Sequence, residues 1–164
     1  MDLDAVRRIV AEDSGLCTVA VVRADGRPHT SLVNAGVLDH PVTGAPVAAY
    51  VTYGPVKLTA LRARPATSLH WRAGWRWAAV EGSSEIIGPD DPRDGVDLPQ
   101  LLRDVFVACG GTHDDWAEYD RVMAEQRRAA VLVEPVRIIG NLWAPPVGQR
   151  PAGSASPGSS RAGG

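Results

Sequence analysis

The sequence predicts an α+β fold, mainly β, in which short antiparallel strands close a small barrel flanked by short helices. Runs rich in β-branched residues are separated by tight-turn signals, of which Ala-Asp-Gly-Arg at residues 24–27 is the clearest. Strand and helix patterns do not alternate regularly, which argues against a doubly wound parallel sheet. Gly82 interrupts the longest expected strand, as a bulge or a barrel corner requires.

The individual elements follow from local patterns. Helices are expected at residues 2–13, 56–63, 98–109 and 113–128. Strands are expected at residues 16–23, 29–38, 47–52, 66–72 and 75–87, and then at 129–134 and 136–141 around Pro135. This gives six or seven strands, of which the first three form an antiparallel meander.

Length and composition predict one ordered domain followed by a tail. The chain has 164 residues, about the size of a single domain. We expect residues 1–144 to form this ordered barrel domain. Of the last twenty residues, 145–164, thirteen are Pro, Gly or Ser, so this segment is expected to be disordered.

Charge and cysteine usage exclude several classes of partner. The net charge of −2 does not favour nucleic acid or an anionic membrane surface. No apolar run approaches the roughly 20 residues of a membrane span, and the N-terminus lacks the apolar core of a secretory signal. Cys17 and Cys109 have no CxxC spacing and are expected to be free, buried thiols. We therefore expect a cytoplasmic protein without membrane or nucleic-acid partners.

Several common catalytic motifs are absent. The chain has neither a Gly-x-Gly-x-x-Gly segment nor a Walker loop, which argues against a Rossmann or P-loop nucleotide site. The four histidines lack metal-ligand spacing, so no metal site is expected. Gly82-Ser83-Ser84 lacks the second glycine of a nucleophile elbow, and residues 90–95 are interpreted as a solvated turn.

One segment favours an anion. Residues 52–57, Thr-Tyr-Gly-Pro-Val-Lys, join a strand end, a tight turn and a helix N-terminus, where free N–H groups and the helix dipole attract negative charge. Lys57, the only lysine of the chain, adds a full positive charge there. A solvated basic surface helix is the alternative interpretation.

Four segments together resemble one superfamily. Residues 25–34, DGRPHTSLVN, look like the second-strand signature of the pyridoxamine-phosphate-oxidase-like split β-barrels. Lys57 with Leu61, Arg62 and Pro65 is similar to the Lys…Leu-Arg…Pro phosphate-binding segment of those proteins, and residues 74–82 resemble a strand of the same fold. Residues 113–128 resemble the late helix of the branch that depends on the deazaflavin coenzyme F-420. The match covers about residues 5–141.

The resemblance implies a homodimer with cofactor sites at its interface and a small-molecule substrate. By that likeness Ser31, Val33 and Asn34 flank the cofactor ring. The phosphate would be held by the segment that contains Thr52, Lys57, Leu61 and Arg62. Trp75 or Trp77 would reach the site from the partner subunit. The chain departs from the family pattern at Pro55, Ala60 and Arg64, which replace a basic residue, Asn and Asp respectively.

The function implied is hydride transfer from a reduced deazaflavin to a conjugated acceptor such as an enone, a quinone or a tetrapyrrole. Such transfer needs orientation and exclusion of water more than an acid–base residue, which agrees with the absence of a catalytic triad. His29 could donate a proton, but a structural, hydrogen-bonded imidazole is the alternative. An FMN-binding oxidase or reductase and a non-catalytic cofactor carrier remain open as alternative functions.

Overall fold

The computed structural model describes residues 1–143, which form a six-stranded antiparallel barrel with four helices. The barrel closes in the order β1-β2-β3-β6-β5-β4. The strands are β1 Leu16–Val22, β2 Pro28–Asp39, β3 Pro46–Thr52, β4 Ala66–Ala73, β5 Arg76–Ile87 and β6 Ala129–Asn141. The predicted fold class is confirmed, and the predicted tail at residues 145–164 lies outside the described residues.

Strand β6 differs from its prediction. Residues 129–141 form one strand rather than two separated by Pro135. The proline is accommodated because the pairing of β5 with β6 shifts register between Glu81 and Gly82, opposite Pro135. A Cβ added at Gly82 would lie 2.1 Å from the carbonyl oxygen of Glu134, so the two backbones approach as only glycine allows. The bulge predicted at Gly82 is confirmed.

Four helices flank the barrel. They are α1 Leu3–Glu12, α2 Pro55–Ala63, α3 Leu98–Ala108 and α4 Trp116–Glu125. Helix α4 is shorter than the predicted helix at residues 113–128. It starts later because the Asp115 side chain accepts hydrogen bonds from the backbone N–H groups of Ala117 and Glu118, which makes Asp115 the N-cap. No helix among residues 1–143 has the length and apolarity that crossing a membrane requires.

Two hydrophobic clusters lie on opposite faces of β3 and β6. Ala48 and Tyr50 of β3, with Ala129 and Val131 of β6, belong to the cluster that fills the barrel interior. The intervening residues of both strands belong to a second cluster, which packs beneath α3 and α4. This alternation is what a strand buried on both faces produces.

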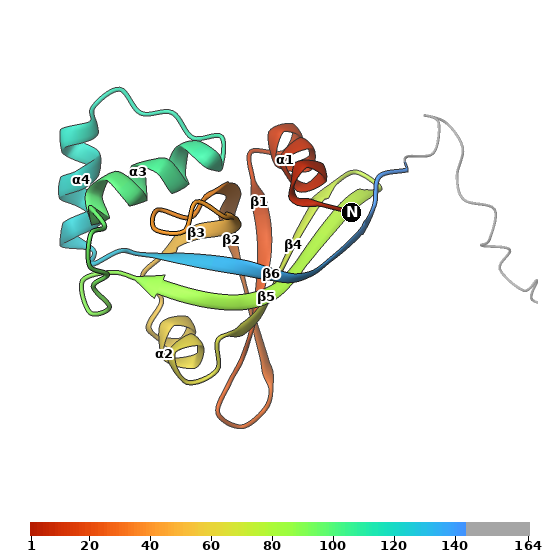
Figure 1. Ribbon diagram of the computed structural model, residues 1–164, viewed down its shortest axis with the longest axis horizontal. Coiled ribbons are helices and arrows are strands. Elements are labelled where there is room, and N and C mark those ends of the chain that lie inside the picture. The colour runs from red at the N-terminus through yellow and green to blue at the C-terminus, as the bar shows by residue number, and fades with distance from the viewer. Residues whose placement is uncertain (144–164) are drawn as a thin grey trace, which may run out of the picture.

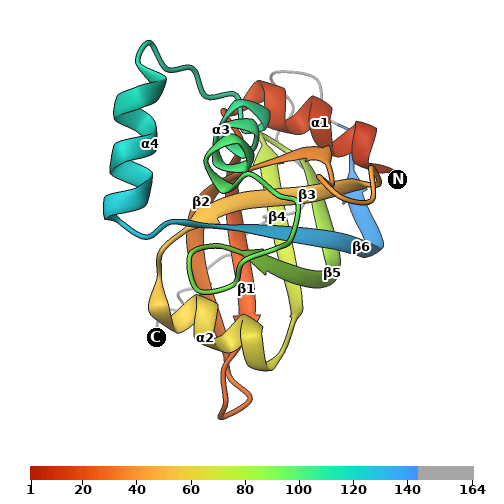
Figure 2. The ribbon, with the colours of Figure 1, turned by 60° about the vertical axis from the view of Figure 1, so that its left-hand side comes forward.

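The α3–α4 pair covers the outside of the barrel at one end (Figures 1 and 2). Helix α3 approaches β2 closely, since a Cβ added at Gly36 would lie 2.2 Å from the carbonyl oxygen of Ala108. Helix α4 packs on α3, where Trp116 and Tyr119 contact Phe106 with ring centroids 6.2 and 5.0 Å away. The packing of α3 on the barrel therefore depends on Gly36, and the packing of α4 on α3 depends on this aromatic cluster.

Candidate functional site

A cavity of about 760 Å³ lies where β2, the β3–α2 connection, the end of α3 and α4 meet. Its size is within the usual range for cofactor sites. The lining residues are Ser14, Leu32, Val33, Asn34, Val51, Thr52, Tyr53, Gly54, Lys57, Phe106, Cys109, Gly110, Gly111, Tyr119, Met123 and Arg128. None of them is acidic, and two are cations. The composition of the wall therefore favours an anionic ligand with an apolar body.

Lys57 is the buried cation of this cavity. Helix α2 begins at Pro55 after the N-cap Gly54, which has no capping side chain, and this places Lys57 in the first turn. Only 5% of its surface is exposed. The Nζ atom donates one long hydrogen bond, 3.5 Å, to Thr52 Oγ1 and lies 5.1 Å from the centroid of the Tyr50 ring.

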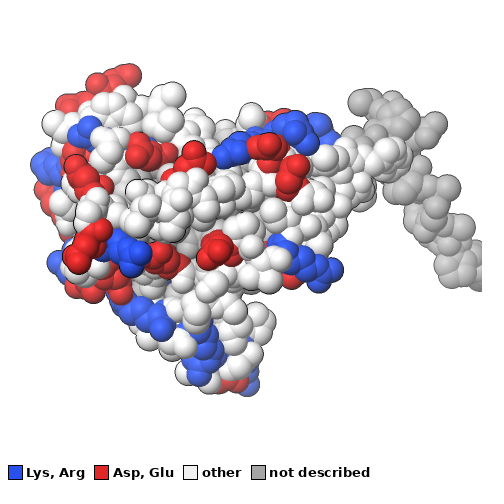
Figure 3. All heavy atoms as spheres, in the orientation of Figure 1, with Lys and Arg blue, Asp and Glu red and all other residues white. Residues whose placement is uncertain are grey.

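The Lys57 ammonium is incompletely satisfied. It has three N–H donors, and no Asp or Glu among residues 1–143 forms a salt bridge with it. Burial lowers the pKa of Lys57 from the ordinary lysine value, because desolvation disfavours the charged form. An anion bound next to Nζ would relieve that cost. Figure 3 shows basic side chains over α2 and the β1–β2 hairpin, on the face of the molecule that it draws.

Arg128 is the second cation of the wall, directly before β6. Its guanidinium lies 3.9 Å from the centroid of the Tyr53 ring, and its Nε atom donates to Gln126 Oε1 at 2.8 Å. No described carboxylate pairs with it. Partial burial lowers the pKa of Arg128, but an arginine remains charged at neutral pH. Arg128 was not predicted as a site residue, because nothing local in the sequence shows that it faces a cavity.

The β2 wall contains two of the three residues predicted to flank a cofactor ring. Val33 and Asn34 line the cavity, and Asn34 Nδ2 donates to the carbonyl oxygen of Ser14 at 2.9 Å. Ser31 is not among the lining residues, and its hydroxyl is buried without a hydrogen-bond partner among the described residues. His29 lies further along β2, opposite Val21 of β1, and does not line the cavity either.

Two residues of the predicted phosphate segment point elsewhere. Arg62 forms a bidentate ion pair with Asp91, at 3.0 Å from Nε and 2.6 Å from Nη2. Leu61 is 2% exposed and packs in the barrel interior. Of the predicted phosphate-binding residues, the structure therefore brings Thr52 and Lys57 to the cavity, but not Leu61 or Arg62.

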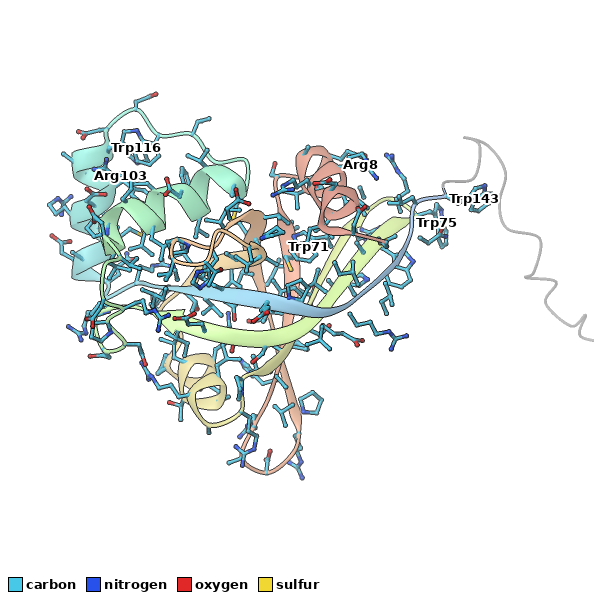
Figure 4. The ribbon with its side chains drawn as sticks, viewed as in Figure 1. Arg8, Trp71, Trp75, Arg103, Trp116 and Trp143 are labelled. Atoms are coloured by element: carbon cyan, nitrogen blue, oxygen red, sulfur yellow. The ribbon has the colours of Figure 1, made fainter. Side chains whose placement is uncertain are left out.

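The predicted tryptophans also lie away from the cavity of their own chain. Trp75 is 65% exposed in the β4–β5 turn, at the end of the barrel opposite α3 and α4 (Figure 4). Trp77 stacks on His70 with ring centroids 5.5 Å apart. A contribution from a partner subunit, as the resemblance implies, stays a prediction.

The α3–α4 wall was not predicted from the sequence. Phe106, Tyr119 and Met123 supply aromatic and apolar surface, and the Tyr119 hydroxyl donates to the carbonyl oxygen of Leu102 at 3.1 Å. Amphipathic spacing within the two helices indicates which residues are apolar, but not that they enclose a ligand site.

No described lining residue provides an activated nucleophile or an acid–base pair. Cys109 lines the cavity, but burial raises its pKa to about 12, so the thiol stays protonated at neutral pH. No histidine lines the cavity, and no cluster suited to a metal ion occurs among residues 1–143. The described lining therefore offers apolar surface and two cations rather than an acid–base pair.

Known proteins share this fold. No family model matches the chain. A conserved hypothetical protein from Mycobacterium tuberculosis is 22% identical, with 85% of this chain and 84% of that chain covered and a TM-score of 0.62. An F420 reductase is 19% identical, with coverages of 79% and 93% and a TM-score of 0.54. A pyridoxamine 5'-phosphate oxidase-related, FMN-binding protein from Nostoc punctiforme is 12% identical, with coverages of 84% and 82% and a TM-score of 0.56.

These similarities establish the fold. The chain has the split-barrel architecture that these proteins share, as the sequence resemblance predicted. A heme storage protein from Vibrio cholerae, 12% identical with a TM-score of 0.52, shares the architecture too. The fold alone therefore does not assign a cofactor, and the assignment depends on the chemistry of the cavity.

Proposed function

We propose that this protein is an oxidoreductase that binds a phosphate-bearing deazaflavin, coenzyme F-420, in the cavity at Lys57. The observation that carries the proposal is the Lys57 ammonium, which is buried, lacks an acidic partner among the described residues, and lies in the first turn of α2 beside an apolar cavity. A phosphate there would satisfy the ammonium and the free N–H groups of the helix start.

Different residues of the chain would bind different parts of the cofactor. Lys57 and the α2 N-terminus would hold the phosphate, and Thr52 fixes the Lys57 side chain by accepting its hydrogen bond. Val33 and Asn34 would flank the ring along β2, while the α3–α4 wall excludes water. When bound, a reduced deazaflavin supplies the hydride. The protein therefore needs to orient the reactants and exclude water rather than provide a catalytic base.

The partner subunit belongs to the same proposal. In the homodimer that we infer, Trp75 or Trp77 of each protomer would approach the cavity of the other. Exposure of Trp75 is consistent with such a contact, because large aromatic surfaces are enriched at interfaces. Sedimentation of the purified protein tests this point, and a monomer at micromolar concentration would contradict it.

FMN is the alternative cofactor, since an FMN-binding protein shares the fold. The pairing of Arg62 with Asp91 leaves Lys57 without a second nearby arginine from α2, which supports F-420 over a cofactor held by several arginines. Heme is less well supported, because no histidine is among the described cavity-lining residues.

Purification followed by titration tests the cofactor assignment. The absorbance spectrum of the purified protein identifies any bound chromophore, and F-420 and FMN are then titrated separately. Saturable F-420 binding with weaker FMN binding is expected, and tight FMN binding without F-420 binding would overturn the assignment. Oxidation of reduced F-420 by a panel of quinones separates an enzyme from a carrier, which would bind the cofactor without turnover.

A further inference from the structure

The cavity has two sides, which the end of β3 separates. Thr52 and Ala129 are register partners, and with exposures of 5% and 2% their side chains point into the barrel. Because side chains alternate along a strand, the next residues outward, Tyr53 and Arg128, belong to the opposite face. They continue the row of Val51, which packs with the cluster beneath α3 and α4.

The two cations are therefore on different sides of the sheet. Lys57 reaches the interior side, where its Nζ atom contacts Thr52 and the Tyr50 ring. Arg128 lies on the outer side, against Tyr53. One anionic group bound at Lys57 would leave Arg128 without a counter-charge. A second anionic group on the outer side would be needed to neutralise it.

The outer side has the chemistry of a site for a planar molecule. The Phe106, Tyr119 and Met123 side chains supply apolar lining, and the exposed Tyr53 ring belongs to the lining of the same cavity. Arg128 is held over Tyr53 by ring stacking and by Gln126, which occupies only its Nε atom. Its two terminal nitrogens have no hydrogen-bond partner among residues 1–143 and could bind a carboxylate with the planar geometry that arginine favours.

The geometry points to Arg128 as the specificity-determining residue for the second substrate, an acceptor with a planar conjugated body and a carboxylate. This inference rests on the proposed function, in which the interior side holds the cofactor phosphate. It assigns the outer side to the acceptor and gives the acceptor a negative charge.

A matched pair of ligands tests the inference without turnover. Calorimetry measures the affinity of the cofactor-free protein for 2-naphthoate and for 2-naphthamide, which have the same ring system and differ in charge. The wild-type protein is expected to prefer the carboxylate by at least about tenfold, the effect of one charge-assisted contact. Arg128→Gln should abolish the preference, and Arg128→Lys should keep part of it.

The neighbouring Arg127 provides the control, because it is exposed, pairs with Asp90 and does not line the cavity. Arg127→Gln should keep the full preference for 2-naphthoate. The inference is overturned if the wild-type protein shows no preference, if Arg128→Gln and Arg128→Lys both retain it in full, or if Lys57→Ala removes it instead.

Titration of FMN and F-420 into the same variants separates this inference from the proposed function. Arg128→Gln should change the affinity for either cofactor by less than about threefold. If it weakens cofactor binding as strongly as Lys57→Ala, Arg128 belongs to the cofactor site and the inference fails. If Lys57→Ala leaves cofactor binding intact, the proposed function fails, while the naphthoate preference still decides the role of Arg128.

Discussion

Replacement of Lys57 by alanine is the perturbation with the best-defined consequence. The variant removes a charge-assisted hydrogen bond to phosphate, which is worth about 1.5–3 kcal/mol. At 1.4 kcal/mol per factor of ten, the dissociation constant of a phosphate-bearing cofactor should rise roughly 10- to 150-fold. Folding should not suffer comparably, because among residues 1–143 Lys57 Nζ makes a single hydrogen bond, at 3.5 Å.

The assay compares ligands with and without the phosphate. FMN and riboflavin have the same ring and ribityl chain, so Lys57→Ala should weaken FMN binding while riboflavin binding changes little. F-420 and its phosphate-free chromophore form the equivalent deazaflavin pair. Fluorescence titration gives all four affinities. Equal affinity of wild-type and variant protein for the phosphorylated ligands would refute the reasoning, as would an equal loss for ligands without phosphate.

The same lysine predicts a pH dependence. Burial lowers the Lys57 pKa in the free protein, whereas a bound phosphate would raise it. Cofactor affinity should therefore be highest at pH values below the lowered pKa of Lys57, and it should fall as the pH rises through that pKa. The stability of the ligand-free protein should change in the opposite direction, because deprotonation relieves the buried charge as the pH rises from the lowered pKa toward the ordinary value. In the Lys57→Arg variant the side chain stays protonated, so cofactor affinity should no longer depend on pH in this range.

Three further variants test the surrounding structure. Leu61→Ala should lower the free energy of unfolding by about 2–5 kcal/mol, measured in urea, because Leu61 is buried in the barrel interior, and it should leave cofactor affinity nearly unchanged. Gly36→Ala should cost about 1–3 kcal/mol and weaken cofactor binding, because the new methyl group would displace α3 from β2; wild-type stability would contradict this. Arg62→Gln should change cofactor affinity by less than about twofold and stability by less than about 1 kcal/mol, because the exposed Arg62 side chain pairs with Asp91. A loss of cofactor affinity as large as that of Lys57→Ala would instead place Arg62 at the phosphate.

The elements of the fold could be predicted because their signals are local. The turn at residues 24–27, the proline that opens α2 and Gly82 in β5 all act within a few positions of the chain. Strand β6 was divided wrongly at Pro135, because the register shift that accommodates the proline depends on the close approach of Gly82 in the paired strand β5. The start of α4 was placed too early, at residue 113, whereas the structure uses Asp115 as the N-cap.

The cavity was harder to predict, because its composition is decided by contacts between distant residues. Lys57 and Thr52 are close in sequence, and both were identified. Arg62 was assigned to the phosphate from the motif alone, since nothing local reveals that Asp91, twenty-nine residues later, pairs with it. Arg128 was not predicted to line the cavity for the converse reason, because its position against Tyr53 exists only in the folded protein.

A crystal structure of the protein grown with F-420 tests the central claim most directly. The account predicts a phosphate oxygen about 2.7–2.9 Å from Lys57 Nζ, the distance of a charge-assisted hydrogen bond. It also predicts the cofactor ring along β2, next to Val33 and facing the α3–α4 wall. A cofactor bound elsewhere, or one whose phosphate lies away from Lys57, would contradict the account.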